Sequence, residues 1–310
     1  MVLDYNRAKW HSYDAMRPYY MTHVRALVDE GIARWNPAYK ENIKDERGVP
    51  VEPIALWNPG QAWRAVSFDE TRLDDATHGD GGDRSGRSER TLRAGHWDKG
   101  DSIGKKNASG QTMSLVGGSN AMGEALIPLI SLSCVDFDEK ILERGPAAIV
   151  NGKRFIMRGT SNPKGSIDGK GILMLVRECL LPMFEAHGVL SPTRRAVVVC
   201  DCVGTHMTTE FLDLCTEHNI VVVLRTPWCS NSIQFEDLRN FWTLKNTKDL
   251  GWFKVKQQAL LLLSQRLSHQ RPQGKGGIVL SFELQLQLLV KPWHVAFSSE
   301  NNRKAWKQVC

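Results

Sequence analysis

Arg195-Ala-Val-Val-Val-Cys-Asp201 is a run of apolar, largely β-branched residues that ends at a carboxylate. Its unbroken apolar character predicts a central strand that is buried on both faces of a sheet. Residues 207–218 predict a helix, and 220–224 predict a second strand of the same kind. The order strand, helix, strand implies a parallel crossover, which indicates an α/β fold.

The residues before this unit predict more of the same sheet. Residues 64–70 alternate partly in polarity and predict a strand that ends on Asp69 and Glu70. Two apolar runs, 111–118 and 123–133, are separated by turn residues and predict a β-hairpin. Residues 172–186 have helical spacing, and Pro182 is expected to kink or split that helix.

Composition divides the chain into three parts. Residues 1–60 are predicted to be an N-terminal helical extension, 61–250 a central domain and 251–310 a basic C-terminal extension, with nine Lys and Arg against two Glu in the last part. Within the central domain, residues 74–110 are crowded with Gly, Asp, Arg and Ser, which predicts a disordered insertion. The basic residues could contact phosphate or simply be solvated, and the sequence leaves both open.

Several classes of protein are excluded by the composition. No uncharged apolar run reaches the roughly 18 residues of a membrane span, and the N-terminus lacks the pattern of a secretory signal. Seven cysteines without regular spacing argue against a disulfide scaffold and for a reducing compartment. Cys200 and Cys202 have no second pair or histidine at ligand spacing, so a zinc site is not expected.

Three carboxylates stand at the positions that matter most for chemistry. Asp69 and Asp201 end predicted strands, and Asp237 falls in the first turn of a helix predicted from about residue 235. Hard divalent cations prefer oxygen ligands, and phosphoryl transfer gains from two ions held about 4 Å apart. Acids delivered by three separate elements therefore suit a metal site.

The neighbours of two of these acids resemble a known family. Asp201-Cys-Val-Gly-Thr-His206 resembles the D-G-x-x-S-H motif of the pogo branch of Tc1/mariner-type DDE transposases. Residues 230–237 with Phe241 and Leu244-Lys245 resemble their third-acid signature, T-x-x-L-Q-P-L-D followed by Phe and Leu-Lys. The 35 residues between Asp201 and Asp237 are close to the interval that the resemblance implies.

The resemblance covers about residues 64–246. Ser67-Phe-Asp-Glu-Thr71 resembles the D-E-T strand of the first acid, and Gly123–Pro128 resembles the G-x-x-L-P-P segment that follows it. Four features depart from the family pattern: Cys202 in place of Gly, Thr205 in place of Ser, Phe235 in place of Pro, and the insertion at 74–110.

The resemblance implies a ribonuclease-H-like catalytic domain over residues 61–250, a mixed sheet flanked by helices. It implies Asp69, Asp201 and Asp237 as catalytic residues and ligands of two Mg²⁺ or Mn²⁺ ions. Glu236 is the rival third ligand, but side chains one residue apart on a helix diverge by about 100°, and the motif offset favours Asp237. DNA is the expected partner, the nucleus the expected location, and a homodimer the assembly considered; no membrane partner is expected.

For several residues near the acids, the sequence leaves a functional and a structural role open. His206 could contact phosphate or orient a ligand, or it could make an ordinary hydrogen bond at a helix start. Glu70 should alternate to the opposite strand face from Asp69 and is expected to be structural or to support the ligands. Trp228 and Trp242 could stack on bases, but core packing is favoured.

The resulting hypothesis is a metal-dependent DNA endonuclease and strand-transferase core of a transposase. Only about 60 residues precede the strand of the first acid, without the basic three-helix pattern of a DNA-end-binding module, which favours a truncated or domesticated copy. The alternative is a catalytically inactive nucleic-acid-binding protein derived from a transposase. A third reading is an ordinary α/β binding protein with coincidental acids.

Overall fold

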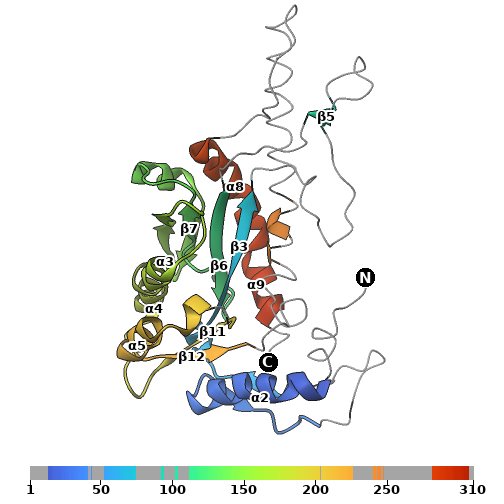
Figure 1. The fold of residues 1–310 in the computed structure, drawn as a ribbon. Helices are drawn as coiled ribbons and strands as arrows, with labels where there is room; N and C mark the ends of the chain where they lie inside the picture. Colours follow the sequence, from blue (N-terminus) through green and yellow to red (C-terminus); the bar gives the residue numbers. More distant parts are fainter. Residues whose placement is uncertain are drawn as a thin grey trace, which may run out of the picture.

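A mixed sheet with helices on both faces forms the centre of the molecule (Figure 1). The computed structural model describes residues 13–40, 43, 52–74, 92–93, 102–103, 112–202, 204–225, 240–241, 243–245, 247 and 281–306. Within those ranges, no helix combines the length and the apolar character that a membrane span requires.

Six strands form the sheet in the order β10-β7-β6-β3-β11-β12. They are β3 (Ala65–Asp74), β6 (Thr112–Asn120), β7 (Leu129–Leu132), β10 (Arg158–Ser161), β11 (Ala196–Cys200) and β12 (Ile220–Leu224). Strands β3, β6 and β7 form an antiparallel meander, which confirms the predicted hairpin. Strands β11 and β12 lie parallel to β3 on its other side. This order, with helices on both faces, is the ribonuclease-H-like fold.

Short pairs of strands and single turns of helix accompany the sheet. The pairs are β1 (Ala33–Trp35) with β2 (Ala55–Trp57), β4 (Leu92–Arg93) with β5 (Ser102–Ile103), and β8 (Ala147–Val150) with β9 (Lys153–Ile156). The helical turns are η1 (Ala62–Arg64), η2 (Glu139–Arg144) and η4 (Gly204–Met207). The paired residues of β4 and β5 lie inside the predicted disordered insertion, most of which is outside the described residues.

One face of the sheet is covered by helices from the middle of the chain. These are α3 (Gly169–Met174), the π-helical η3 (Leu175–Leu180), α4 (Leu181–His187) and α5 (Thr209–Glu217). The predicted 172–186 helix is therefore confirmed, and its π-helical stretch lies just before Pro182, whose missing N–H interrupts the regular hydrogen-bond pattern. Val66, Phe68 and Val198 of the sheet pack into this core.

The other face is covered by the two ends of the chain. Helix α2 (Tyr13–Asp29) lies across the end of the sheet, and α8 (Phe282–Ala296) and α9 (Ser299–Trp306) lie along it (Figure 1). Val197 and Val199 pack with α2 and α9, whereas Leu73 and Met113 pack with α8. Part of the predicted C-terminal extension thus contributes to the core, while the boundary at residue 250 stays a prediction.

The predicted end of the first acid-bearing strand is wrong. Strand β3 does not stop at Glu70 but continues to Asp74, because β6 pairs with it along its whole remaining length. Asp69 therefore lies in the middle of a long strand. The shorter neighbour β11 pairs with β3 only up to Ser67. Beyond the end of β11, that side of β3 is an edge of the sheet, and Asp69 lies on it.

A buried histidine ties α2 to the end of β12. His23 is 3% exposed, and its Nε2 lies 3.2 Å from the carbonyl oxygen of Leu224. Since a carbonyl can only accept, Nε2 carries the proton in this bond. Burial lowers the pKa of His23 from 6.5 to about 4, although the hydrogen bond to Leu224 opposes the shift, and nearby Arg225 adds to it.

We expect acid to weaken this attachment. The folded pKa of His23 lies below the unfolded value, so the unfolded chain binds more protons and stability falls as the pH drops from 6.5 towards 4, by up to about 3 kcal/mol. His23→Gln can keep the donor to Leu224 without titrating, so its urea unfolding midpoint should change less between pH 7 and pH 4.5. An equally steep fall in the variant would contradict this role.

Candidate active site

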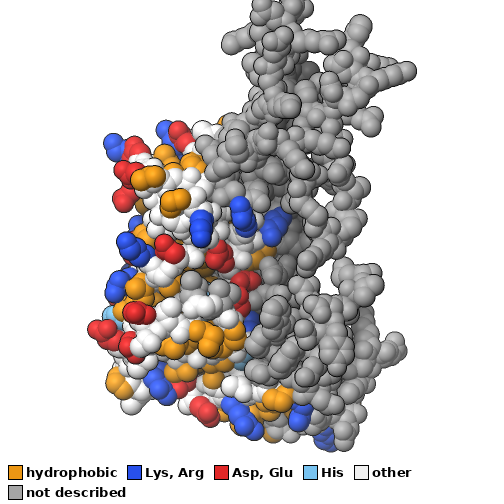
Figure 2. Space-filling view, viewed as in Figure 1, with side chains coloured by type: hydrophobic (Ala, Val, Ile, Leu, Met, Phe, Trp, Pro, Cys, Tyr) orange, Lys and Arg blue, Asp and Glu red, His pale blue; other side chains and the backbone are white. Residues whose placement is uncertain are grey.

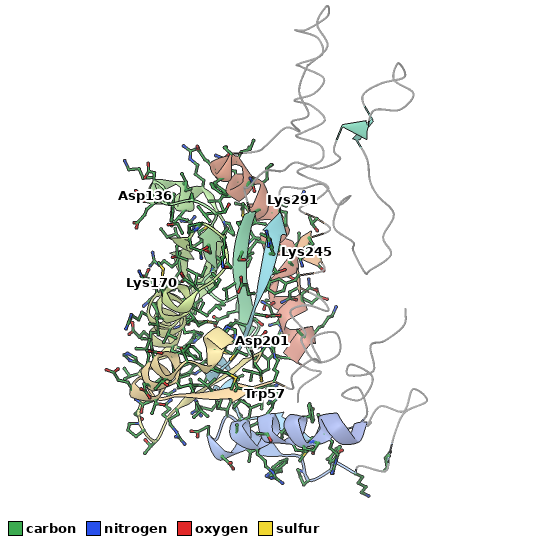
Figure 3. The ribbon with its side chains drawn as sticks, in the orientation of Figure 1. Trp57, Asp136, Lys170, Asp201, Lys245 and Lys291 are labelled. Carbon is green, nitrogen blue, oxygen red and sulfur yellow. The ribbon has the colours of Figure 1, made fainter. Side chains whose placement is uncertain are left out.

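The strand register brings two of the three predicted acids to the same level of the sheet. Val199 is paired with Ser67 on parallel neighbouring strands. Two residues further along each strand, Asp201 follows the end of β11 and Asp69 lies within β3. Figure 3 labels Asp201 beside these central strands. The two carboxylates line one pocket of about 300 Å³.

Both acids are partly shielded from water. Asp69 is 5% exposed, and its Oδ1 accepts a hydrogen bond of 2.8 Å from the backbone N–H of Glu70. The Asp201 side chain is 21% exposed. Carboxylates at the edge of a sheet, shielded but reachable from a pocket, suit a hard divalent cation, because such cations prefer oxygen ligands.

His206 holds Asp201 in place. Its Nδ1 lies 2.6 Å from Asp201 Oδ1 and within hydrogen-bond distance, 3.2 Å, of the Asp201 backbone oxygen. The ring packs edge-on against Phe68, with centroids 5.3 Å apart, and close to Phe211. The contact with the Asp201 backbone is the ordinary hydrogen bond considered for His206, and the contact with the Asp201 carboxylate is what orientation of a ligand requires, so both roles stay open.

A glycine beside Asp69 makes room for the segment that follows the third acid in the chain. Gly117 is the cross-strand partner of Asp69. A Cβ at Gly117 would lie 2.6 Å from Cζ of Phe297 and 3.1 Å from Cε1 of Phe241. Phe241 therefore packs directly over the strand next to Asp69. Asp237 precedes Phe241 by four positions and lies outside the described residues, as do Glu236, Phe235, Trp228 and Trp242.

Arg225 is a buried cation that the sequence analysis missed. It follows β12, its N–H donates to the Cys200 carbonyl at 2.8 Å, and its guanidinium donates to Ser67 Oγ. Only 2% of Arg225 is exposed. A guanidinium at this level of the sheet offsets part of the negative charge that Asp69 and Asp201 concentrate there. Nothing local in the sequence distinguishes this arginine from a solvated one.

The thiols of the two cysteines that flank Asp201 lie in different environments. Burial raises the pKa of the Cys200 thiol far above its usual range, although Arg225 opposes the shift. The Cys202 thiol donates to the Arg225 carbonyl at 2.8 Å. Across the described ranges, no three His, Cys, Asp or Glu side chains are grouped closely enough to hold a metal ion.

The pocket also contains residues that the sequence analysis did not select. Besides the two acids and His206, its lining consists of Glu70, Arg72, Ser114, Lys164 and Ser166. Glu70 Oε1 accepts a 3.2 Å hydrogen bond from the backbone N–H of Ile167, which is the structural contact expected of it. Lys164 belongs to the turn motif Asn162-Pro-Lys-Gly. This motif predicts a loop, but it does not predict that the loop lines a pocket together with the acids.

Comparisons with known proteins gave matches among solved structures only. No protein-family model matches the sequence, and no curated protein is detectably similar to it. Among solved structures, the Mos1 strand transfer complex is 12% identical over 80% of this chain and 52% of that chain, with a TM-score of 0.40. The catalytic domain of Mos1 mariner transposase is 10% identical over 80% of this chain and 83% of that chain, with a TM-score of 0.30.

A third similar structure, the Mos1 mariner paired end complex with Mn, is 11% identical over 93% of this chain, with a TM-score of 0.36. This chain spans about half the length of the Mos1 chain in the strand transfer complex. The identities and TM-scores are low, so the ribonuclease-H-like assignment depends on the strand order and pairing of the sheet itself.

Proposed function

We propose that this chain is the metal-dependent DNA endonuclease and strand-transferase core of a transposase, of the pogo branch of the Tc1/mariner type. The observation that carries the proposal is the pairing of Asp69 with Asp201 in one pocket of a ribonuclease-H-like sheet. The motif around each acid supports the same assignment. DNA as the partner, a nuclear location and a homodimeric assembly belong to this proposal.

In this proposal Asp69 and Asp201 hold the divalent ions, and Asp237 adds the third carboxylate. The packing of Phe241 over Gly117 supports Asp237, because the chain then passes over the strand beside Asp69 shortly after the third acid. Mg²⁺ or Mn²⁺, when bound, neutralises phosphate charge and makes water or a DNA 3′-hydroxyl a better nucleophile. Glu236 is the competing ligand.

The surrounding residues prepare the acids for that task. His206 fixes the direction of the Asp201 carboxylate, and the backbone N–H of Glu70 fixes one oxygen of Asp69. Arg225 lies beneath the site and reduces the repulsion between the carboxylates before an ion binds. The pocket is thus arranged in advance, which lowers the cost of gathering like charges.

The proposal predicts nicking of supercoiled plasmid by the full chain in Mg²⁺ or Mn²⁺ and none in EDTA. Asp69→Asn should remove the activity while it leaves the thermal unfolding midpoint within a few degrees of the wild type. Asp213 is a matched control, because it is a carboxylate on the exposed face of α5, and Asp213→Asn should nick normally. Plasmid binding without nicking in any metal would favour the catalytically inactive alternative.

A further inference from the structure

A tight turn between β10 and α3 contributes two residues to the pocket that Asp69 and Asp201 line. In residues 162–168, the side chain of Asn162 accepts from the Lys164 N–H at 2.8 Å, and Gly165 adopts a φ of 62°. The buried Ser131 hydroxyl donates to the Ser166 carbonyl at 2.9 Å, and the Asn162 amide donates to the same oxygen. Several hydrogen bonds thus hold a short polar loop in one conformation.

The turn is also attached to the acid-bearing strand. Glu70, the neighbour of Asp69, accepts from the Ile167 N–H at 3.2 Å, across 97 positions of sequence. Asp168 then caps α3 by accepting from the Gly171 N–H at 2.9 Å. The turn is therefore fastened at both of its ends, and its position relative to Asp69 is set by the strand itself.

The turn contributes Lys164 to the pocket that the carboxylates also line. Lys164 and Ser166 from the turn line the pocket together with Arg72 and Ser114, which are paired on β3 and β6. Figure 2 shows Lys and Arg side chains next to Asp and Glu side chains across the middle of this face. The pocket lining thus combines the carboxylates of Asp69, Glu70 and Asp201 with two cations and two hydroxyl groups.

We propose that Lys164 and Arg72 bind the phosphate groups of the nucleic-acid strand that lies across Asp69 and Asp201. The inference rests on the proposed function, because it assigns these residues to the substrate of that site. A polyanion that approaches two carboxylates is repelled, so its contacts must come from cations at the rim. Lys164 offers a compact charge and Arg72 a planar fork, and both are common phosphate donors.

The hydrogen bonds of the turn hold the backbone of Lys164 in place before phosphate binds. A lysine on a loose loop loses side-chain and backbone freedom on binding phosphate, which weakens the contact. Asn162, Ser131 and Glu70 remove most of the backbone part of that cost in advance. Asn162→Ala should therefore weaken binding although it removes no charge.

DNA binding of the full chain in EDTA tests the inference without cleavage. Fluorescence anisotropy with a labelled duplex should show that Lys164→Gln and Arg72→Gln each weaken binding by about three- to tenfold and lower the slope of log K against log salt by about 0.9. Lys164→Arg should restore the wild-type slope. Lys153→Gln serves as the matched control, because Lys153 is exposed on β9 outside the pocket lining.

The outcomes separate this inference from the proposed function. Wild-type affinity and salt slope in both Gln variants would overturn the phosphate contact, even if the chain nicks DNA. Absence of DNA binding by the wild type at low salt would overturn it as well. Conversely, a chain that never nicks but loses affinity in Lys164→Gln keeps the phosphate contact and loses the endonuclease proposal. Unfolding curves of each variant verify that it is folded.

Discussion

Asp201→Asn is expected to lower the rate of metal-dependent nicking by about a thousandfold, a loss of about 4 kcal/mol in transition-state stabilisation. Asn is nearly isosteric with Asp, so the packing of His206 against Phe68 should survive. The variant loses the negative charge that would hold a cation and that lies against His206 Nδ1. A single-turnover assay in Mg²⁺ and Mn²⁺ measures the effect.

The same assay separates the two candidates for the third acid. Asp237→Asn should cause a loss comparable to that of Asp201→Asn, whereas Glu236→Gln should keep most of the activity. The two positions are adjacent in sequence and both carry a carboxylate, so each substitution removes the same charge. Activity that survives in Asp237→Asn but disappears in Glu236→Gln would exchange the roles of these residues. Nicking that survives both Asp201→Asn and Asp237→Asn would remove the site altogether.

Trp306→Ala is expected to cost about 3–5 kcal/mol of folding free energy. Trp306 is 1% exposed, its indole N–H donates to the Ser119 hydroxyl at 3.2 Å, and its ring lies edge-on to Trp57 at 5.7 Å. Removal of the ring leaves a cavity among α9, β6 and α2, and the Ser119 hydroxyl loses a buried donor. Urea unfolding at pH 7 gives the size of the loss.

Trp35→Ala provides the matched control for this effect. Trp35 lies on β1 and is 44% exposed, so the same side-chain deletion should cost far less. A large loss for Trp306→Ala and a small one for Trp35→Ala would establish the C-terminal helices as part of the fold. Similar losses in the two variants would contradict the central place of Trp306 in the core.

The sequence predicted the elements of this protein better than their ends. Residues 196–200 and 220–224 read as buried strands because continuous β-branched apolar residues have few other stable environments, and both strands are present. The hairpin of β6 and β7 was equally clear. The end of β3 was predicted wrongly, since Asp69 and Glu70 look like the end of a strand, whereas the partner strand β6 keeps the backbone extended past them.

The residue types around Asp201 and Asp69 were sufficient to select them as site candidates, because their motifs are local and carry the chemistry with them. Their meeting in one pocket depends on the parallel register of β11 with β3. Arg225 and Lys164 could not have been selected from sequence, since nothing local distinguishes a buried arginine or a pocket lysine from a solvated one. Burial and charge proximity are properties of residues distant in sequence, and folding alone brings them together.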